Sequence, residues 1–224
     1  MRVLILILIF SGMFGCNPTA DSVRSGKFNE SDFAGLESLG DAYKHIKLDY
    51  ELEDLNNKSI KFTTCQQVEG YDREKILASQ YRLFTLLQIN CAAAKYYFSG
   101  KLAVNTHFPD KLSLDLIKLF PAVAVPFTSR EDMVKRQNKR LDEYEKKLQL
   151  KSLDNGAVTV VATDGEEMTY IVMARADVDN DSTEDIVVRL DWNIPNSFGQ
   201  GFDLLVFSKT SAVAPIKLLW RYTK

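Results

Sequence analysis

The feature that most constrains the fold is a change in the spacing of apolar residues at Asn155-Gly156. Before this point apolar side chains recur at helical spacing, whereas after it short β-branched segments alternate with turns. Helices and strands that are segregated along a chain are typical of the α+β class. We therefore predict a mainly helical part at residues 31–155, followed by an antiparallel β-meander at residues 156–224, with both in one compact domain.

The expected helices are bounded by capping residues and prolines. The strongest runs from about residue 73 to residue 99 and ends at Gly100, and a shorter one covers residues 112–120 before Pro121. A third begins with a capping box at residues 128–131 and continues to about residue 150. We also expect a short helix after Ser31-Asp32 and a strand near residues 59–63.

The charges of the third expected helix are ordered in a way that favours a solvated surface over a partner-binding one. Each acid stands four residues before a base, an orientation that contributes a few tenths of a kcal/mol per pair. The pairs are Glu131/Lys135, Asp132/Arg136, Asp142/Lys146 and Glu143/Lys147.

The expected strands of the meander are short and separated by turn residues. Asp164-Gly165 is a strong hairpin signal between the first two. The strands are expected at residues 157–162, 167–176, 185–192, 202–207 and 216–222.

The N-terminus has the pattern of a secretory signal. One positive charge, Arg2, precedes an apolar run at residues 3–10 that is too short to span a membrane. The segment Met13-Phe14-Gly15-Cys16 resembles the lipobox of bacterial lipoproteins, although Phe14 departs from the small residue usual there. The resemblance implies a signal peptide at residues 1–15 and acyl chains such as palmitate on Cys16. An ordinary signal peptide and an uncleaved anchor are the alternatives.

This resemblance implies an exported protein held at a membrane surface by lipid. Residues 16–30 are polar and would form a flexible tether. Asn17 follows the cysteine, which in lipoproteins of diderm bacteria implies sorting to the outer membrane. The formal charge of the whole chain is −2, so electrostatics do not support nucleic-acid binding.

Two cysteines remain if Cys16 is acylated. Export makes a disulfide between Cys65 and Cys91 an expectation, because such proteins leave the reducing cytosol. It would close a loop of about 26 residues and contribute on the order of 3 kcal/mol. The alternative is that Cys91 is a small apolar residue on the buried stripe of its helix.

The segment from Asp177 to Val188 carries most of the chemistry in the sequence. Asp177, Asp179 and Asp181 alternate along a loop between two strands, so their side chains can converge on one point. The carbonyl of Thr183 and the carboxylate of Asp185 would complete a set of five oxygens for Ca²⁺. The alternative is a solvated acidic hairpin tip, which is common.

This loop resembles the calcium loop of FG-GAP-type and dockerin-type repeats, D-x-D-x-D-G-x-x-D followed by strand residues. Ser182 replaces the usual glycine, and Val188 stands where an EF-hand has its bidentate glutamate, which excludes an EF-hand. The loop occurs once, so the resemblance implies neither a propeller nor a cellulosome role. A weak site, with an affinity of about 0.1–1 mM, is expected to rigidify the hairpin.

No catalytic motif is evident. His45 and His107 lie outside metal or nucleophile motifs, and Glu166-Glu167 is more typical of a solvated turn than of glycosidase carboxylates. We therefore expect a non-catalytic binding or assembly module of the cell envelope, with a metal-assisted hydrolase as the alternative. Its partner would be an envelope protein or a glycan, which could stack on aromatic residues of the sheet, although core packing explains these residues at least as well. The residues are Trp192, Phe198, Phe202 and Trp220.

Overall fold

The computed structural model describes residues 26–126, 129–195 and 199–223. The predicted signal peptide, Cys16 and most of the predicted tether lie outside these residues. None of the helices in the described part of the chain combines the length and the hydropathy of a membrane-spanning segment.

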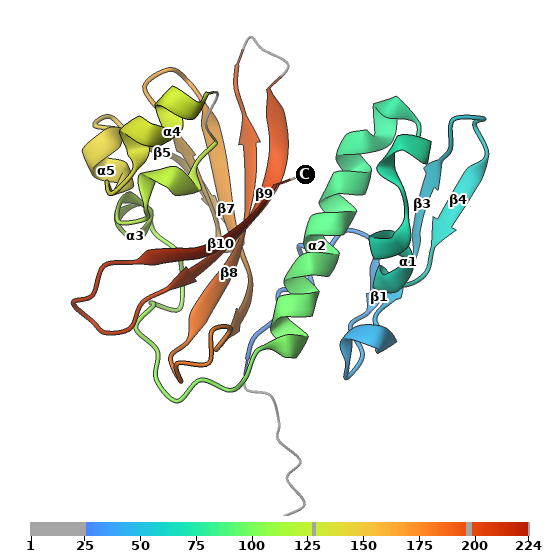
Figure 1. Ribbon diagram of the computed structural model, residues 1–224, viewed down its shortest axis with the longest axis horizontal. Helices are drawn as coiled ribbons and strands as arrows, with labels where there is room; N and C mark the ends of the chain where they lie inside the picture. Colours follow the sequence, from blue (N-terminus) through green and yellow to red (C-terminus); the bar gives the residue numbers. More distant parts are fainter. Residues whose placement is uncertain (1–25, 127–128, 196–198, 224) are drawn as a thin grey trace, which may run out of the picture.

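A six-stranded antiparallel sheet forms the centre of the molecule, and its strands pair in the order in which they follow one another (Figure 1). This is the arrangement that short turns between sequential strands favour. The strands are β5 (Gln149–Asp154), β6 (Ala157–Val161), β7 (Glu167–Ala176), β8 (Asp185–Asn193), β9 (Gln200–Ser208) and β10 (Lys217–Thr223).

The predicted fold class is wrong about the N-terminal part, which is not mainly helical. Residues 36–62 form two small two-stranded sheets, one pairing β1 with β2 and the other pairing β3 with β4. Gly35 and Gly40 adopt positive φ angles of 78° and 64°, which interrupt the helix that was expected after Ser31-Asp32. The strands are β1 (Leu36–Ser38), β2 (Lys47–Leu48), β3 (Tyr50–Glu53) and β4 (Ser59–Phe62), with a 3₁₀ turn η1 (Tyr43–His45) before β2.

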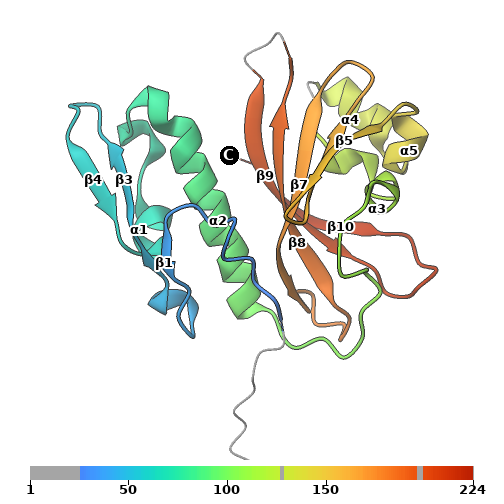
Figure 2. The same cartoon turned by 180° about the vertical axis from the view of Figure 1, so that it is seen from behind.

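The longest helix, α2 (Tyr81–Ser99), covers one face of the sheet and contacts β7, β8 and β9. It lies between the sheet and the β3–β4 hairpin in both views (Figure 1, Figure 2). It begins later than predicted, because residues 73–80 form two 3₁₀ turns, η2 (Arg73–Lys75) and η3 (Ala78–Gln80), instead of a helix.

The predicted disulfide is confirmed. It joins Cys65, the first residue of α1 (Cys65–Gly70), to Cys91 in the middle of α2, with 5.4 Å between the two Cα atoms. Both cysteines are buried. The bond therefore holds the small N-terminal elements against the helix that packs on the sheet.

The third predicted helix is also wrong in its extent. Two short helices, α4 (Arg130–Arg136) and α5 (Leu141–Tyr144), replace it, and Asn138 with a φ of 58° separates them. The chain then extends into β5, which pairs with β6. Residues 149–150 belong to the sheet because this pairing satisfies their backbone groups, which local helical spacing cannot reveal.

Only half of the ion pairs expected on that helix form among the described residues. Lys135 pairs with Glu131 at 2.9 Å and Arg136 with Asp132 at 2.8 Å, both within α4. The other two would need a helix through residue 147, and α5 ends at Tyr144.

The sheet has a hydrophobic core on each face, so its central strands are buried on both sides. Met173, Val187 and Leu204 belong to the core beneath α2. Tyr170, Val188 and their neighbours belong to the other core, which is covered by α3 (Leu114–Lys118), the 3₁₀ turn η4 (Ala122–Ala124) and the short helix α5.

Candidate metal centre

The acidic loop connects β7 to β8, and its own carboxylates hold its shape. The backbone N–H groups of Asp181 and Ser182 donate to the two carboxylate oxygens of Asp177, both at 3.1 Å. The N–H of Asp181 also donates to Asp179 at 3.2 Å. Asn180 and Ser182 adopt positive φ angles of 66° and 69°, so Ser182 makes the sharp turn for which glycine is usual.

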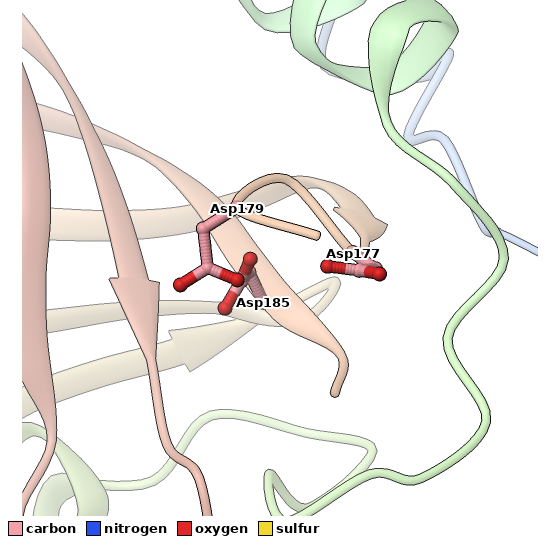
Figure 3. Close-up of side chains that lie close together, drawn as sticks. All are labelled: Asp177, Asp179 and Asp185. Carbon is pink, nitrogen blue, oxygen red and sulfur yellow. The ribbon is translucent and has the colours of Figure 1, made fainter. Parts of the chain in front are cut away.

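Three of the four predicted carboxylates come together. One oxygen from each of Asp177, Asp179 and Asp185 lies within 4.8 Å of the other two. Figure 3 shows that Asp177 and Asp185 stand where the two strands meet the loop, while Asp179 projects from the loop itself beside Asp185. Asp177 and Asp185 are buried and Asp179 is exposed, so the cluster opens to solvent at Asp179.

Asp185 is the residue of the cluster that most requires a partner. Its side chain is fully buried, and the N–H of Val178 donates to Oδ2 at 2.8 Å. Oδ1 makes no hydrogen bond of good geometry in the described part of the chain, and the hydroxyl of Ser208 near this carboxylate is buried without a partner as well. Burial raises the pKa of Asp185 to about 6, although the N–H of Val178 and the Ser208 hydroxyl oppose this rise.

No lysine or arginine among the described residues forms an ion pair with the three clustered carboxylates. Buried carboxylates are normally paired with a cation, since an unpaired buried charge is costly. Each carboxylate has about four lone-pair sites, so Asp177 can keep both of its backbone hydrogen bonds and still bind an ion. The donor set suits a hard, oxygen-seeking cation.

Asp181 and Thr183 are not in this cluster. Oδ1 of Asp181 accepts a hydrogen bond from the backbone N–H of Thr183 at 2.7 Å, which closes the second half of the loop. The coordination of an ion by Asp181 and by the Thr183 carbonyl stays a prediction.

The loop packs against the segment between α2 and α3, a contact that the sequence did not indicate. Lys101 and Asp177 exchange two backbone hydrogen bonds, at 2.9 and 3.0 Å. The N–H groups of Val104 and Asn105 both donate to the carbonyl of Ser182. These bonds position the loop from outside its own hairpin and make it different from a freely solvated tip.

A partly buried ion pair fixes the strand end beside the loop. Nη1 of Arg175 donates to Glu184 at 2.8 Å, and its Nη2 donates to the carbonyls of Pro109 and Asp110. Thr106 adds a hydrogen bond to the same Glu184 carboxylate at 2.8 Å. Glu184, the one glutamate of the loop, is therefore neutralised by Arg175 and not free to serve an ion.

A second acidic position, Glu166, lies at the opposite end of β7. It was expected in a solvated turn, and this prediction is wrong. Glu166 is buried and lines a cavity of about 210 Å³ with Arg136 and Tyr144. Burial, followed by the neighbouring charge of Asp164, raises the pKa of Glu166 to about 7. The alternation of side chains along a strand could have indicated this, because Glu166 and Met168 point to the same face.

No family model, no curated protein and no solved structure matches the chain. A proposal about function therefore rests on the geometry of the Asp177–Asp185 loop.

Proposed function

We propose that the loop from Asp177 to Asp185 binds Ca²⁺ and that the ion stabilises the β7–β8 hairpin. The observation that carries this proposal is the fully buried Asp185, whose Oδ1 is unpartnered beside two further carboxylates. Water and the carbonyls of the loop would bring the three carboxylates to the six to eight ligands that Ca²⁺ prefers. Mg²⁺ should be held less well, because it demands a tighter octahedron.

A structural role for the ion is better supported than a catalytic one. Only Asp179 of the three carboxylates is exposed, whereas a metal-assisted hydrolase needs a coordination position that a substrate can fill. The hydrogen bonds to residues 101–105 also hold the loop to the rest of the molecule. We therefore favour a binding or assembly module without turnover over a hydrolase.

The lipobox-like segment supports an exported, lipid-anchored protein, with the outer membrane as its destination in a diderm host. The disulfide between Cys65 and Cys91 is consistent with an oxidising compartment. In its host, a Cys16→Ala variant should lose acylation and membrane fractionation. A variant that keeps its normal mass and its membrane association would contradict the anchor.

The calcium proposal is tested by thermal unfolding of metal-free protein. With 5 mM Ca²⁺ and a Kd of about 0.5 mM, binding to the native state adds roughly 1.4 kcal/mol, which should raise Tm by about 3–5 °C. Asp179→Ala should abolish this shift, since it removes a clustered carboxylate from an exposed position.

Asp164→Ala is the matched control, because it removes an exposed aspartate from the turn at the other end of the same strand and should leave the shift intact. A melting temperature that responds neither to Ca²⁺ nor to EDTA, in protein shown to retain no metal, would contradict the calcium proposal.

A further inference from the structure

A cavity of about 380 Å³ lies between α2, α1 and the edge strand β10, on the face of the sheet that α2 covers only in part. Its volume falls within the range of about 300–1,000 Å³ that is typical of small-molecule sites. Trp220 and Tyr222 of β10 pair with Val206 and Leu204 of β9, so their side chains point to the α2 face.

The wall formed by β10 is aromatic, and Trp220 is its exposed part. The rings of Trp220 and Tyr222 are stacked, with centroids 5.4 Å apart and an interplanar angle of 24°. Tyr96 of α2 leans against Trp220 with centroids 5.1 Å apart. Trp220 is 37% exposed, although a tryptophan used for core packing would be covered. Of the other aromatics considered for stacking, Phe202 is buried, whereas Phe198 lies outside the described residues.

The α2 side of the cavity contains a buried amide oxygen without a hydrogen-bond partner among the described residues. Gln88 is 7% exposed, and its Oε1 accepts no hydrogen bond from any described residue. An unpaired buried amide is destabilising, so water or a ligand is needed to satisfy it. A hydroxyl group suits this position well, because it can both donate to and accept from an amide.

The rim of the cavity is polar but carries no net charge. Nζ of Lys95 and the hydroxyl of Tyr43 both donate to Oε1 of Glu69, at 3.0 and 2.7 Å. The other Glu69 oxygen and the remaining Lys95 protons can serve a ligand. Because the two charges neutralise each other, the site does not select an ionic ligand.

We propose that this cavity binds a neutral carbohydrate. A pyranose with equatorial substituents presents a flat face of C–H groups to the exposed part of the Trp220 indole and hydroxyl groups to Gln88, Glu69 and Lys95. An apolar ligand would leave Gln88 unsatisfied, and a charged one would compete with the Lys95–Glu69 pair. The site is separate from the metal centre, and its test does not depend on Ca²⁺.

The test is a titration of the folded protein with triacetylchitotriose and with cellotriose. Binding is monitored by ¹H–¹⁵N chemical-shift changes and by tryptophan fluorescence. We expect saturable shifts at residues lining the cavity. Trp220→Ala should weaken binding about tenfold, because it removes the exposed stacking surface. Leu219→Ala is the matched control, since Leu219 belongs to the same strand, is 39% exposed and is not among the residues that line the cavity.

A second variant separates binding from folding. Gln88→Leu removes the unpaired amide, so Tm should stay unchanged or rise while sugar binding falls at least tenfold. The proposal is overturned if no saturable shift appears up to about 10 mM sugar. It is also overturned if Trp220→Ala binds as well as the wild type, or if an aromatic peptide binds the cavity and neither sugar does.

Discussion

Strand β7 has an acidic turn at each end, and the two turns differ in the surroundings of their buried carboxylates. The turn before β7 places Glu166 in a cavity beside Arg136, whose guanidinium is paired with Asp132. The turn after it brings Asp177, Asp179 and Asp185 together with no arginine or lysine paired to them among the described residues.

The difference shows that the charge of a buried carboxylate can be neutralised in different ways. At Glu166 a proton suffices, because burial raises the pKa to about 7 and the neutral acid needs no counterion. At Asp185 burial raises the pKa to about 6, so this carboxylate is mostly ionised at neutral pH, and two other carboxylates stand beside it. The proposed cation would compensate all three.

The largest expected effect concerns how much each turn contributes to stability in the absence of metal. Asp177→Ala should lower the free energy of unfolding by about 2–4 kcal/mol even without metal, because the backbone N–H groups of Asp181 and Ser182 lose the carboxylate that accepts their hydrogen bonds. Asp164→Ala removes one exposed acceptor of the Glu166 N–H and should lower it by about 0.5–1 kcal/mol. Chemical denaturation in EDTA measures both values. Equal losses would show that the two turns are equally solvated.

A second expectation concerns the charge of Asp185. Asp185→Asn should raise the stability of metal-free protein at pH 7 by about 1–2 kcal/mol, because a neutral amide replaces a buried carboxylate that is mostly ionised there. The same variant should lose the Ca²⁺-induced rise in Tm. Melting curves with EDTA and with Ca²⁺ give both results. A variant less stable than the wild type in EDTA would contradict the unpaired state of Oδ1.

The pH dependence of stability should reveal Glu166. Its pKa is about 7 in the folded protein, above the ordinary value of 4.5, so the folded state binds the proton more tightly. The stabilisation is fully present below about pH 4.5 and is lost as the pH rises to about 7. Glu166→Gln should therefore be more stable than the wild type by about 1–2 kcal/mol at pH 8 and nearly equal to it at pH 4.5.

Glu167→Gln provides the control for this experiment, since Glu167 lies next in the chain and pairs with Lys151 at the surface. Denaturation curves at several pH values compare the three proteins. If Glu166→Gln and Glu167→Gln follow the same pH profile, Glu166 is solvated and the two turns do not differ.

The smallest effect concerns Asp181, which the sequence suggests as a ligand. Asp181→Ala should reduce stability by about 0.5 kcal/mol through the lost hydrogen bond to Thr183. It should keep most of the Ca²⁺-induced rise in Tm, because its carboxylate lies outside the cluster. A loss of the rise as complete as that in Asp179→Ala would place Asp181 among the ligands.

Local patterns sufficed to locate the strands from residue 157 onward. Each is a short apolar, β-branched segment between strong turn signals, and such segments have no competing helical interpretation. The disulfide was also predictable, because Cys65 and Cys91 are the only cysteines after Cys16.

The same reasoning gave wrong predictions where one spacing of apolar residues is compatible with both a helix and a strand. Phe33, Leu36, Leu39 and Tyr43 have helical spacing, but these residues lie in and around a small sheet. Residues 149–150 continue a helical pattern and yet pair with β6. In both regions a neighbouring strand about ten residues further along the chain supplied the backbone hydrogen bonds, and helix propensity is too weak to oppose this pairing.

By itself, the sequence determined that acidic residues would gather in one loop between two strands, because their alternation and the flanking apolar segments are local properties. Only the tertiary structure decided which of them converge. Asp185 is buried by the sheet, Asp181 is held by Thr183, and Glu184 is neutralised by Arg175. The hydrogen bond to Asp181 comes from within the loop, and Arg175 stands on the other strand of the same hairpin. The burial of Asp185 and the contacts of the loop with residues 101–110 depend on more distant groups, and these surroundings set the charge state of each carboxylate.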